Sequence, residues 1–164
     1  MKLSYKKILS FEPCYDPVRH ITKDWTGTAI DLLRMKHIPA KDRLWVCLRK
    51  GILTKRQYVQ FALACARSVE KHATDTRVKQ CNDIVEQYLK GRATRMDVET
   101  GQWGAAYAAF WTELTELGES AAWTAVWAAK VARWEWVASM AWITEVAGTE
   151  KQCQFLINIL TRRS

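Results

Sequence analysis

The chain is poor in the residues that break or cross-link a fold. Its 164 residues include three prolines, seven glycines and five cysteines. So little proline and glycine excludes a low-complexity or fibrous chain. Because the cysteines are scattered and no two have C-x-x-C spacing, the sequence predicts neither a disulfide scaffold, a zinc site nor a thioredoxin-like motif. Four of them lie within helical patterns and are expected to fill the core as reduced thiols: Cys47, Cys65, Cys81 and Cys153.

Long uninterrupted hydrophobic runs are also missing. The first seven residues, MKLSYKK, are mixed polar and unlike a signal peptide. In the most apolar segment, Lys130, Arg133, Glu135 and Glu145 break the sequence well short of the ~20 apolar residues that a membrane helix needs. We therefore expect a soluble, cytoplasmic protein with no membrane partner.

Recognisable catalytic motifs are missing too. The sequence has no phosphate-binding glycine loop, no G-x-S-x-G and no H-E-x-x-H. None of its three histidines has a second histidine or a cysteine at i+3 or i+4, so no metal site is predicted. Cys14 and His20 alone resemble a nucleophile and a base, but the charge beside Cys14 is the acidic Asp16, which does not favour a thiolate. The sequence predicts a protein that is not an enzyme and has no cofactor.

Alanine and tryptophan dominate the C-terminal part of the chain. Thirteen alanines and seven of the nine tryptophans fall between residues 103 and 147. Alanine is the best helix former, and small residues let helix backbones approach while the large indole rings fill the remaining gaps. This segment predicts closely packed helices and says nothing about chemistry.

Helical patterns follow one another from residue 26 onward, joined by short loops. They predict an all-α fold of about seven helices, arranged as an antiparallel multi-helix bundle or as stacked helix pairs. The expected helices run over about 28–36, 39–50, 54–69, 75–90, 94–117, 120–146 and 149–160.

We expect a single domain over residues 1–164. Residues 1–25 form an irregular N-terminal arm, in which Pro13 and Pro17 fix turns and a short strand near 3–9 is weakly indicated. Residues 26–92 supply basic helices, and residues 93–164 supply the Ala/Trp-rich core helices.

Capping residues and glycines set the expected helix limits. Thr94 with Asp97 opens one helix, Gly118 ends it, and Ser120 caps the next. Gly101 and Gly104 lie inside this helix, where each costs ~1 kcal/mol relative to alanine. Either a neighbouring helix lies close against them, or the helix breaks near Gly101.

The net charge of +8 is unevenly distributed. Residues 1–95 carry twenty Lys/Arg and nine Asp/Glu, a balance of +11, whereas residues 96–164 carry five and eight, a balance of −3. This asymmetry predicts an acidic or polyanionic partner for the N-terminal half. The densest basic stretch, here called the basic block, supplies the expected partner contacts: Arg34, Lys36, Lys41, Arg43, Arg49, Lys50, Lys55 and Arg56.

Three alternatives to an acidic protein partner stay open. Cations at helix C-termini are favoured by the helix macrodipole whatever the function. The block would suit nucleic acid if Trp25, Trp45 or Tyr58 were available for stacking, although Trp45 and Tyr58 lie on apolar helix faces. The chain would be a structural or oligomerisation module if Trp103 or Trp136 were exposed.

Three phrases carry a family resemblance: IPAKDRLWVCL at 38–48, FALACAR at 61–67 and YLKGRAT at 88–94. Together with the Ala/Trp helices that follow, they resemble helical bacterial immunity proteins and Ala/Trp-rich proteins encoded by phages. The resemblance covers about residues 38–146. It implies an all-helical protein that binds another protein, such as a toxin or a defence component, in the host cytoplasm if the gene is phage-borne. It implies no catalytic residues. Toxin-neutralising proteins are often acidic, whereas this chain is basic, which favours an acidic partner surface.

Overall fold

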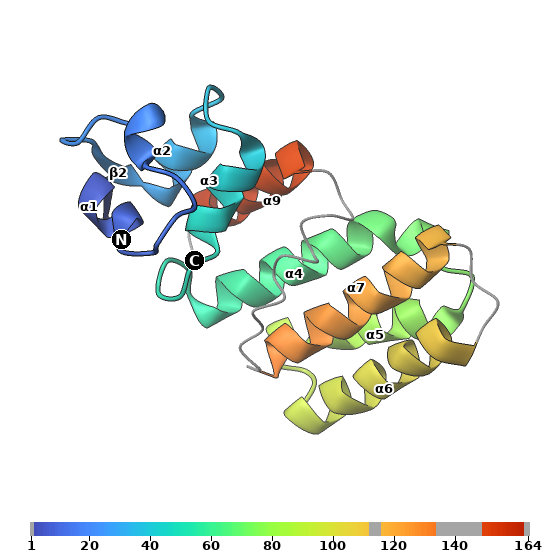
Figure 1. The fold of residues 1–164 in the computed structure, drawn as a ribbon. Coiled ribbons are helices and arrows are strands. Elements are labelled where there is room, and N and C mark those ends of the chain that lie inside the picture. The colour runs from blue at the N-terminus through green and yellow to red at the C-terminus, as the bar shows by residue number, and fades with distance from the viewer. Residues whose placement is uncertain (1, 112–115, 134–148, 163–164) are drawn as a thin grey trace. The chain divides into compact units, whose positions relative to one another are not determined.

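The computed structural model describes residues 2–111, 116–133 and 149–162, and it is all-α apart from one small two-stranded sheet (Figure 1). The chain forms two compact units. The N-terminal unit comprises Met1–Thr54 and Thr149–Ser164, and the bundle unit comprises Lys55–Gly148. The sequence predicted one domain over residues 1–164. The structure adds that residues 149–164 belong to the N-terminal unit, although they follow the bundle unit in the chain.

The N-terminal unit begins with more regular structure than the irregular arm that the sequence predicted. Strand β1 (Lys2–Ser4) pairs antiparallel with β2 (Thr26–Thr28). Between them lie the short helix α1 (Tyr5–Leu9) and the 3₁₀ turn η1 (Pro17–Arg19). The short strand indicated near 3–9 corresponds to β1, and the arm is irregular over 10–16 and 20–25, as predicted. The pairing of β1 with β2, across more than twenty residues, has no local pattern in the sequence.

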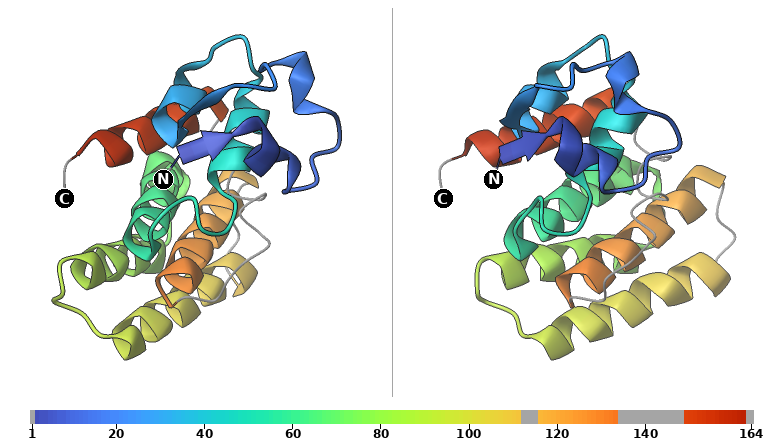
Figure 2. Two further views of the ribbon diagram at one scale, coloured as in Figure 1. Left: turned by 90° about the vertical axis from the view of Figure 1, so that its left-hand side faces the viewer. Right: turned by 60° about the vertical axis from the view of Figure 1, so that its left-hand side comes forward.

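Three helices complete the N-terminal unit: α2 (Ala29–Arg34), α3 (Ala40–Cys47) and α9 (Thr149–Thr161). Helix α9 packs against α2 and α3, as both views in Figure 2 show. The fully buried Leu156 of α9 joins a core that the N-terminal elements supply. The Cys153 thiol of α9 donates a hydrogen bond to the Ala40 carbonyl at 3.7 Å.

The bundle unit packs four long helices together: α4 (Lys55–Val69), α5 (Thr76–Leu89), α6 (Arg95–Trp111) and α7 (Glu116–Ala132). The short 3₁₀ turn η2 (Glu70–His72) follows α4. Small side chains line the contacts, as the composition predicted. The fully buried alanines of α6 and α7 are Ala105, Ala108, Ala121, Ala122, Ala125, Ala128 and Ala129.

Side-chain caps confirm several predicted helix starts. Thr28 and Asp31 form a reciprocal capping box at the start of α2. Asp75 accepts a hydrogen bond from the Arg77 backbone at the start of α5. Thr94 and Asp97 cap α6 in the same reciprocal way, with an Asp97 N to Thr94 Oγ1 distance of 3.2 Å. Each pair satisfies backbone N–H groups that have no partner within the helix.

The predicted helix boundary at Gly118 and Ser120 was wrong. Helix α7 is already helical at Glu116, so both residues lie inside its first turns. The alanine face that follows packs in the core, and this packing outweighs the ~1 kcal/mol that a glycine costs in a helix. The predicted continuation of this helix over 134–146 lies outside the described residues.

The close helix contact predicted at Gly101 is confirmed. Helix α6 runs through Gly101 without a break, and a Cβ atom there would lie 3.0 Å from Ile84 Cδ1 and 3.4 Å from Cys81 Cα on α5. The glycine therefore lets α6 pack directly against Ile84 of α5, and a Cβ atom there would make the Ile84 side chain shift. Within the described residues, the helices are too short or too polar to cross a membrane.

Candidate partner-binding site of the N-terminal unit

The two units differ sharply in charge. The N-terminal unit carries fourteen Lys/Arg and six Asp/Glu, whereas the bundle unit carries eleven of each. The whole net charge of +8 therefore belongs to the N-terminal unit, and the bundle unit is neutral. The C-terminal segment 149–164 contributes to this charge, because it adds three Lys/Arg and one Glu to the N-terminal unit.

Arg43 is a correction to the predicted contact residues. Its side chain is fully buried, with 0% exposure, so it cannot meet a partner. Its guanidinium donates to the carbonyls of Ile38, at 2.9 Å, and Leu33. It also pairs with Glu150 of α9. Arg43 is a structural cation that joins α2, α3 and α9.

The other predicted contacts fall into different settings. Lys55 and Arg56 belong to the bundle unit, where Arg56 Nη1 donates to the Leu89 carbonyl at 2.9 Å. Arg49 lies over the Trp45 ring, with 3.7 Å between the guanidinium carbon and the ring centroid. The remaining four are exposed cations of the N-terminal unit: Arg34, Lys36, Lys41 and Lys50. Lys36 also pairs with Glu150 at 3.2 Å.

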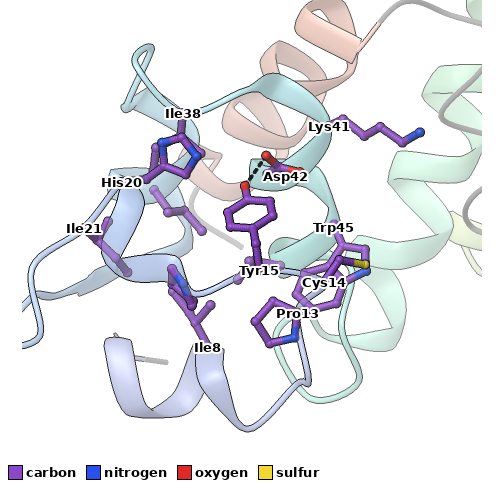
Figure 3. A pocket seen from close by; sticks show the side chains of 13 residues that line it. Ile8, Pro13, Cys14, Tyr15, His20, Ile21, Ile38, Lys41, Asp42 and Trp45 are labelled. Carbon is purple, nitrogen blue, oxygen red and sulfur yellow. Dashed lines mark hydrogen bonds between the residues drawn. The ribbon is translucent and has the colours of Figure 1, made fainter.

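The same unit contains a cavity of about 190 Å³, and one of these cations, Lys41, is among its lining residues (Figure 3). Its walls are mainly apolar and come from α1, from the segment 13–21, from α2 and from α3. The lining residues are Ile8, Pro13, Cys14, Tyr15, Pro17, His20, Ile21, Leu32, Ile38, Lys41, Asp42, Trp45 and Val46. The exposed Lys41 therefore brings the basic block to the edge of an apolar hollow.

Tyr15 fastens the segment 13–21 to α3. Its phenol donates a hydrogen bond to Asp42 Oδ2. Burial, followed by this hydrogen bond, raises the pKa of Tyr15 to about 12. The His20 ring meets the Tyr15 ring edge-on, with 5.6 Å between centroids, and the Arg19 guanidinium lies 5.7 Å from the centroid of the same ring. These contacts hold one wall of the cavity in place.

Local hydrogen bonds explain why this segment turns where it does. Asp16 caps η1 by accepting from the Val18 backbone at 2.9 Å, and it also accepts from the Tyr5 phenol at 2.7 Å. Both bonds favour the carboxylate, so the pKa of Asp16 is lowered, with the backbone hydrogen bond as the largest cause. Pro17 occupies the first turn of η1, where a missing N–H has no cost.

The structure places Cys14 and His20 around the same cavity, but it does not join them as nucleophile and base. Figure 3 shows Cys14 on the side of Trp45 and His20 on the side of Ile38, with the Tyr15 ring between them. Within the described residues, no hydrogen bond links the two side chains. The same residues also contain no cluster of His, Cys, Asp or Glu that could hold a metal ion.

The four cysteines predicted as core residues are confirmed. All are buried free thiols. Burial raises the pKa of Cys81 to about 12 and also raises the pKa of the others. Thiols held in the protonated form are poor nucleophiles.

The bundle unit exposes an apolar stripe on α6. Its members are spaced along one helix face: Met96, Trp103 and Tyr107. Trp103 is 65% exposed, which is the observation that the oligomerisation alternative required. Trp136 lies outside the described residues.

The cavity itself had no signal in the sequence. Tyr15 and Asp42 lie twenty-seven positions apart and belong to no motif, so their hydrogen bond depends on the folded path of the arm. The neighbouring Pro13 and Pro17 indicated turns, but they did not indicate what the turns would enclose.

Comparisons with protein-family models, with curated proteins and with solved structures give no match for this chain. The resemblance to helical immunity proteins therefore stays a prediction, and no residue role is transferred from another protein.

Proposed function

We propose that this protein is a non-enzymatic binding protein whose N-terminal unit holds an acidic surface of a macromolecular partner. The observation that carries the proposal is the location of the entire net charge of +8 on one unit. A field of this size raises the rate of encounter with an acidic surface and excludes basic partners. The neutral bundle then serves as a scaffold. An immunity-like or phage counter-defence inhibitor, acting on a toxin or a defence component, would work in this way.

A protein partner is better supported than nucleic acid. The aromatic rings near the basic block offer little exposed surface on which nucleic-acid bases could stack. Tyr58 is buried, and Trp25 is only partly exposed. The Arg49 guanidinium already covers one face of Trp45. Single-stranded nucleic acid needs exposed rings on which bases stack. The exposed Lys41 lies instead at the edge of an apolar cavity, which is an arrangement typical of protein recognition.

The test is charge reversal in the tagged full chain. The variant Arg34→Glu/Lys41→Glu/Lys50→Glu changes three exposed cations of the N-terminal unit. The matched control Lys71→Glu/Arg92→Glu/Arg95→Glu makes the same charge change on the bundle unit. Circular dichroism and thermal unfolding verify that both variants fold.

Each chain is used to capture partners from a lysate, with nuclease added to half of every sample. We expect a discrete protein band that survives nuclease, is retained by the control and is lost from the N-terminal variant. Retention of the band by the N-terminal variant would contradict the assignment of the surface. Loss of all captured material on nuclease treatment would make the partner a nucleic acid.

The exposed stripe on α6 favours a second candidate, self-association through the bundle unit. Two copies of a neutral unit meet without long-range charge repulsion. Light scattering after gel filtration should then give a dimer for the natural chain and a monomer for Trp103→Glu. A monomer in both cases would eliminate this candidate.

A further inference from the structure

The cavity of the N-terminal unit has the size of a single bulky side chain. At about 190 Å³ it lies below the ~300–1,000 Å³ of sites that take cofactors and drug-sized ligands. A cavity of ~150 Å³ accommodates benzene. One phenyl or leucyl group would therefore fill most of the space between Ile8, Ile21 and Val46.

The walls fit an apolar group, because most of the lining side chains are apolar. Of the polar groups in the lining, the Tyr15 phenol and the Asp42 carboxylate bind each other. A polar ligand would therefore lose its own hydration against a largely apolar wall.

The rim fits negative charge. Lys41 is exposed at the edge of the cavity, next to the Asp42 carboxylate that binds Tyr15, and its unit carries the whole net positive charge of the chain. Trp45, also in the wall, carries the Arg49 guanidinium on its ring. Such a cavity suits a peptide segment in which one large apolar side chain enters the cavity and acidic side chains lie near Lys41 and Arg49.

The geometry points to an anchor pocket: the cavity takes a phenylalanine or leucine side chain from an acidic segment of the partner protein, while carboxylates on either side of that residue face Lys41. This inference rests on the proposed function and names the feature that the partner must present. The anchor supplies affinity through burial, and the carboxylates supply selectivity.

Synthetic peptides test the pocket without the natural partner. The probe is the acetylated and amidated heptapeptide DEDFDED, titrated into the ¹⁵N-labelled full chain. DEDADED lacks the anchor, and NQNFNQN lacks the charge. The readout is the shift of the Trp45 indole N–H signal, which is assigned from a Trp45→Phe spectrum.

We expect DEDFDED to shift the Trp45 signal saturably and to bind about tenfold or more tightly than either control peptide, because moving a phenyl group from water into an apolar cavity is worth at least one decade of affinity. Equal affinity of DEDFDED and DEDADED would overturn the pocket. Equal affinity of DEDFDED and NQNFNQN would overturn the acidic segment. The absence of any saturable shift would overturn both.

Variants locate the binding. Val46→Phe adds a ring at the cavity wall and should abolish the saturable shift. Lys41→Glu should weaken DEDFDED binding about tenfold, whereas Arg162→Glu, an equal charge change on an exposed residue away from the lining, should weaken it less than about threefold. Equal weakening by the two charge variants would overturn the role of Lys41.

The outcomes separate this inference from the proposed function. If the triple charge reversal loses the lysate partner while Val46→Phe retains it, the binding surface stands and the pocket fails. If the triple charge reversal retains the partner, the proposed function fails whatever the peptides do.

Discussion

Arg43 shows how little the charge of a residue says about its role. Sequence spacing cannot distinguish it from Lys41, two positions earlier, yet one side chain is fully buried and the other is exposed. The difference comes from the helix face that each residue occupies and from carbonyls on α2 and on the α2–α3 connection that need a donor. Those carbonyls lack partners until Arg43 reaches them, and no local pattern in the sequence records this.

Replacement of Arg43 should therefore affect stability more than binding. We expect Arg43→Met to lower the free energy of unfolding by ~2–4 kcal/mol, because the Ile38 and Leu33 carbonyls lose their donor inside the protein. Lys36→Met, which removes an exposed partner of the same Glu150, should cost ~0–1 kcal/mol. Urea unfolding of the two variants gives the comparison, and equal losses would contradict the structural role of Arg43.

The raised pKa of Tyr15 predicts that the N-terminal unit loses stability at alkaline pH. Its folded pKa of about 12 lies above the ordinary value of 10, so its phenol favours the folded state below pH 10. This contribution is lost as the pH rises from 10 to 12. Absorbance at 295 nm should show a late tyrosine phase whose amplitude falls in Tyr15→Phe, while Tyr5, whose pKa is also raised by its hydrogen bond to Asp16, still contributes. A late phase of unchanged amplitude in Tyr15→Phe would assign it to other tyrosines.

At the scale of single elements, the helices were predictable where a local cap defines them. The starts of α2, α5 and α6 each depend on a side chain within three positions of the backbone group that it caps. Such short-range chemistry is visible in a sequence. The start of α7 was missed because Gly118 is a reasonable local stop signal that only tertiary packing overrules.

The two glycines inside α6 should respond to alanine in opposite ways. Gly104→Ala should stabilise the fold by ~0.5–1 kcal/mol, because its new Cβ atom would meet only Arg77 Cβ at an ordinary 3.7 Å. Gly101→Ala should destabilise it by ~1 kcal/mol, because the new Cβ atom would lie only 3.0 Å from Ile84 Cδ1 and the cost of this overpacking exceeds the gain in helix propensity. Thermal unfolding of the two single variants provides the measurement. A stabilised Gly101→Ala would mean that the Ile84 side chain shifts easily.

The site was less predictable than the helices. The predicted basic block includes Lys41, whose role in binding stays a prediction, but the apolar cavity beside it depends on a strand pair, on the Tyr15–Asp42 hydrogen bond and on the packing of α3. The strand pair and the hydrogen bond each join residues more than twenty positions apart. Their distances arise from the whole fold, so composition and periodicity carry no trace of them.

At the scale of the whole molecule, each unit should respond separately to the loss of a core side chain. Leu156→Ala, in α9, should destabilise the N-terminal unit by ~2–5 kcal/mol and lower hydrogen-exchange protection in α2 and α3. Val85→Ala, in α5, should cost ~1.5–3 kcal/mol and lower protection in α4 to α7. An equal loss of protection across the whole chain in both variants would show that the two units unfold as one.

The two units also differ in net charge: the N-terminal unit carries +8, and the bundle unit is neutral. Because the N-terminal unit holds the net charge, raised salt should weaken partner capture while leaving the stability of the bundle unit nearly unchanged. Capture at 50 and 500 mM NaCl, with circular dichroism of the same samples, tests this. Loss of helical signal together with the partner would point to unfolding instead of charge screening.

The return of α9 to the N-terminal unit also determines when the protein can fold during its synthesis. A ribosome that adds roughly 5–20 residues per second needs roughly 5–20 s to make residues 55–148. Throughout that interval the leucines of α2 and α3 lack the helix that covers them. The bundle, whose sequence is continuous, is free to fold first, and the nascent N-terminal segment becomes a natural client for chaperones until its last helix is translated.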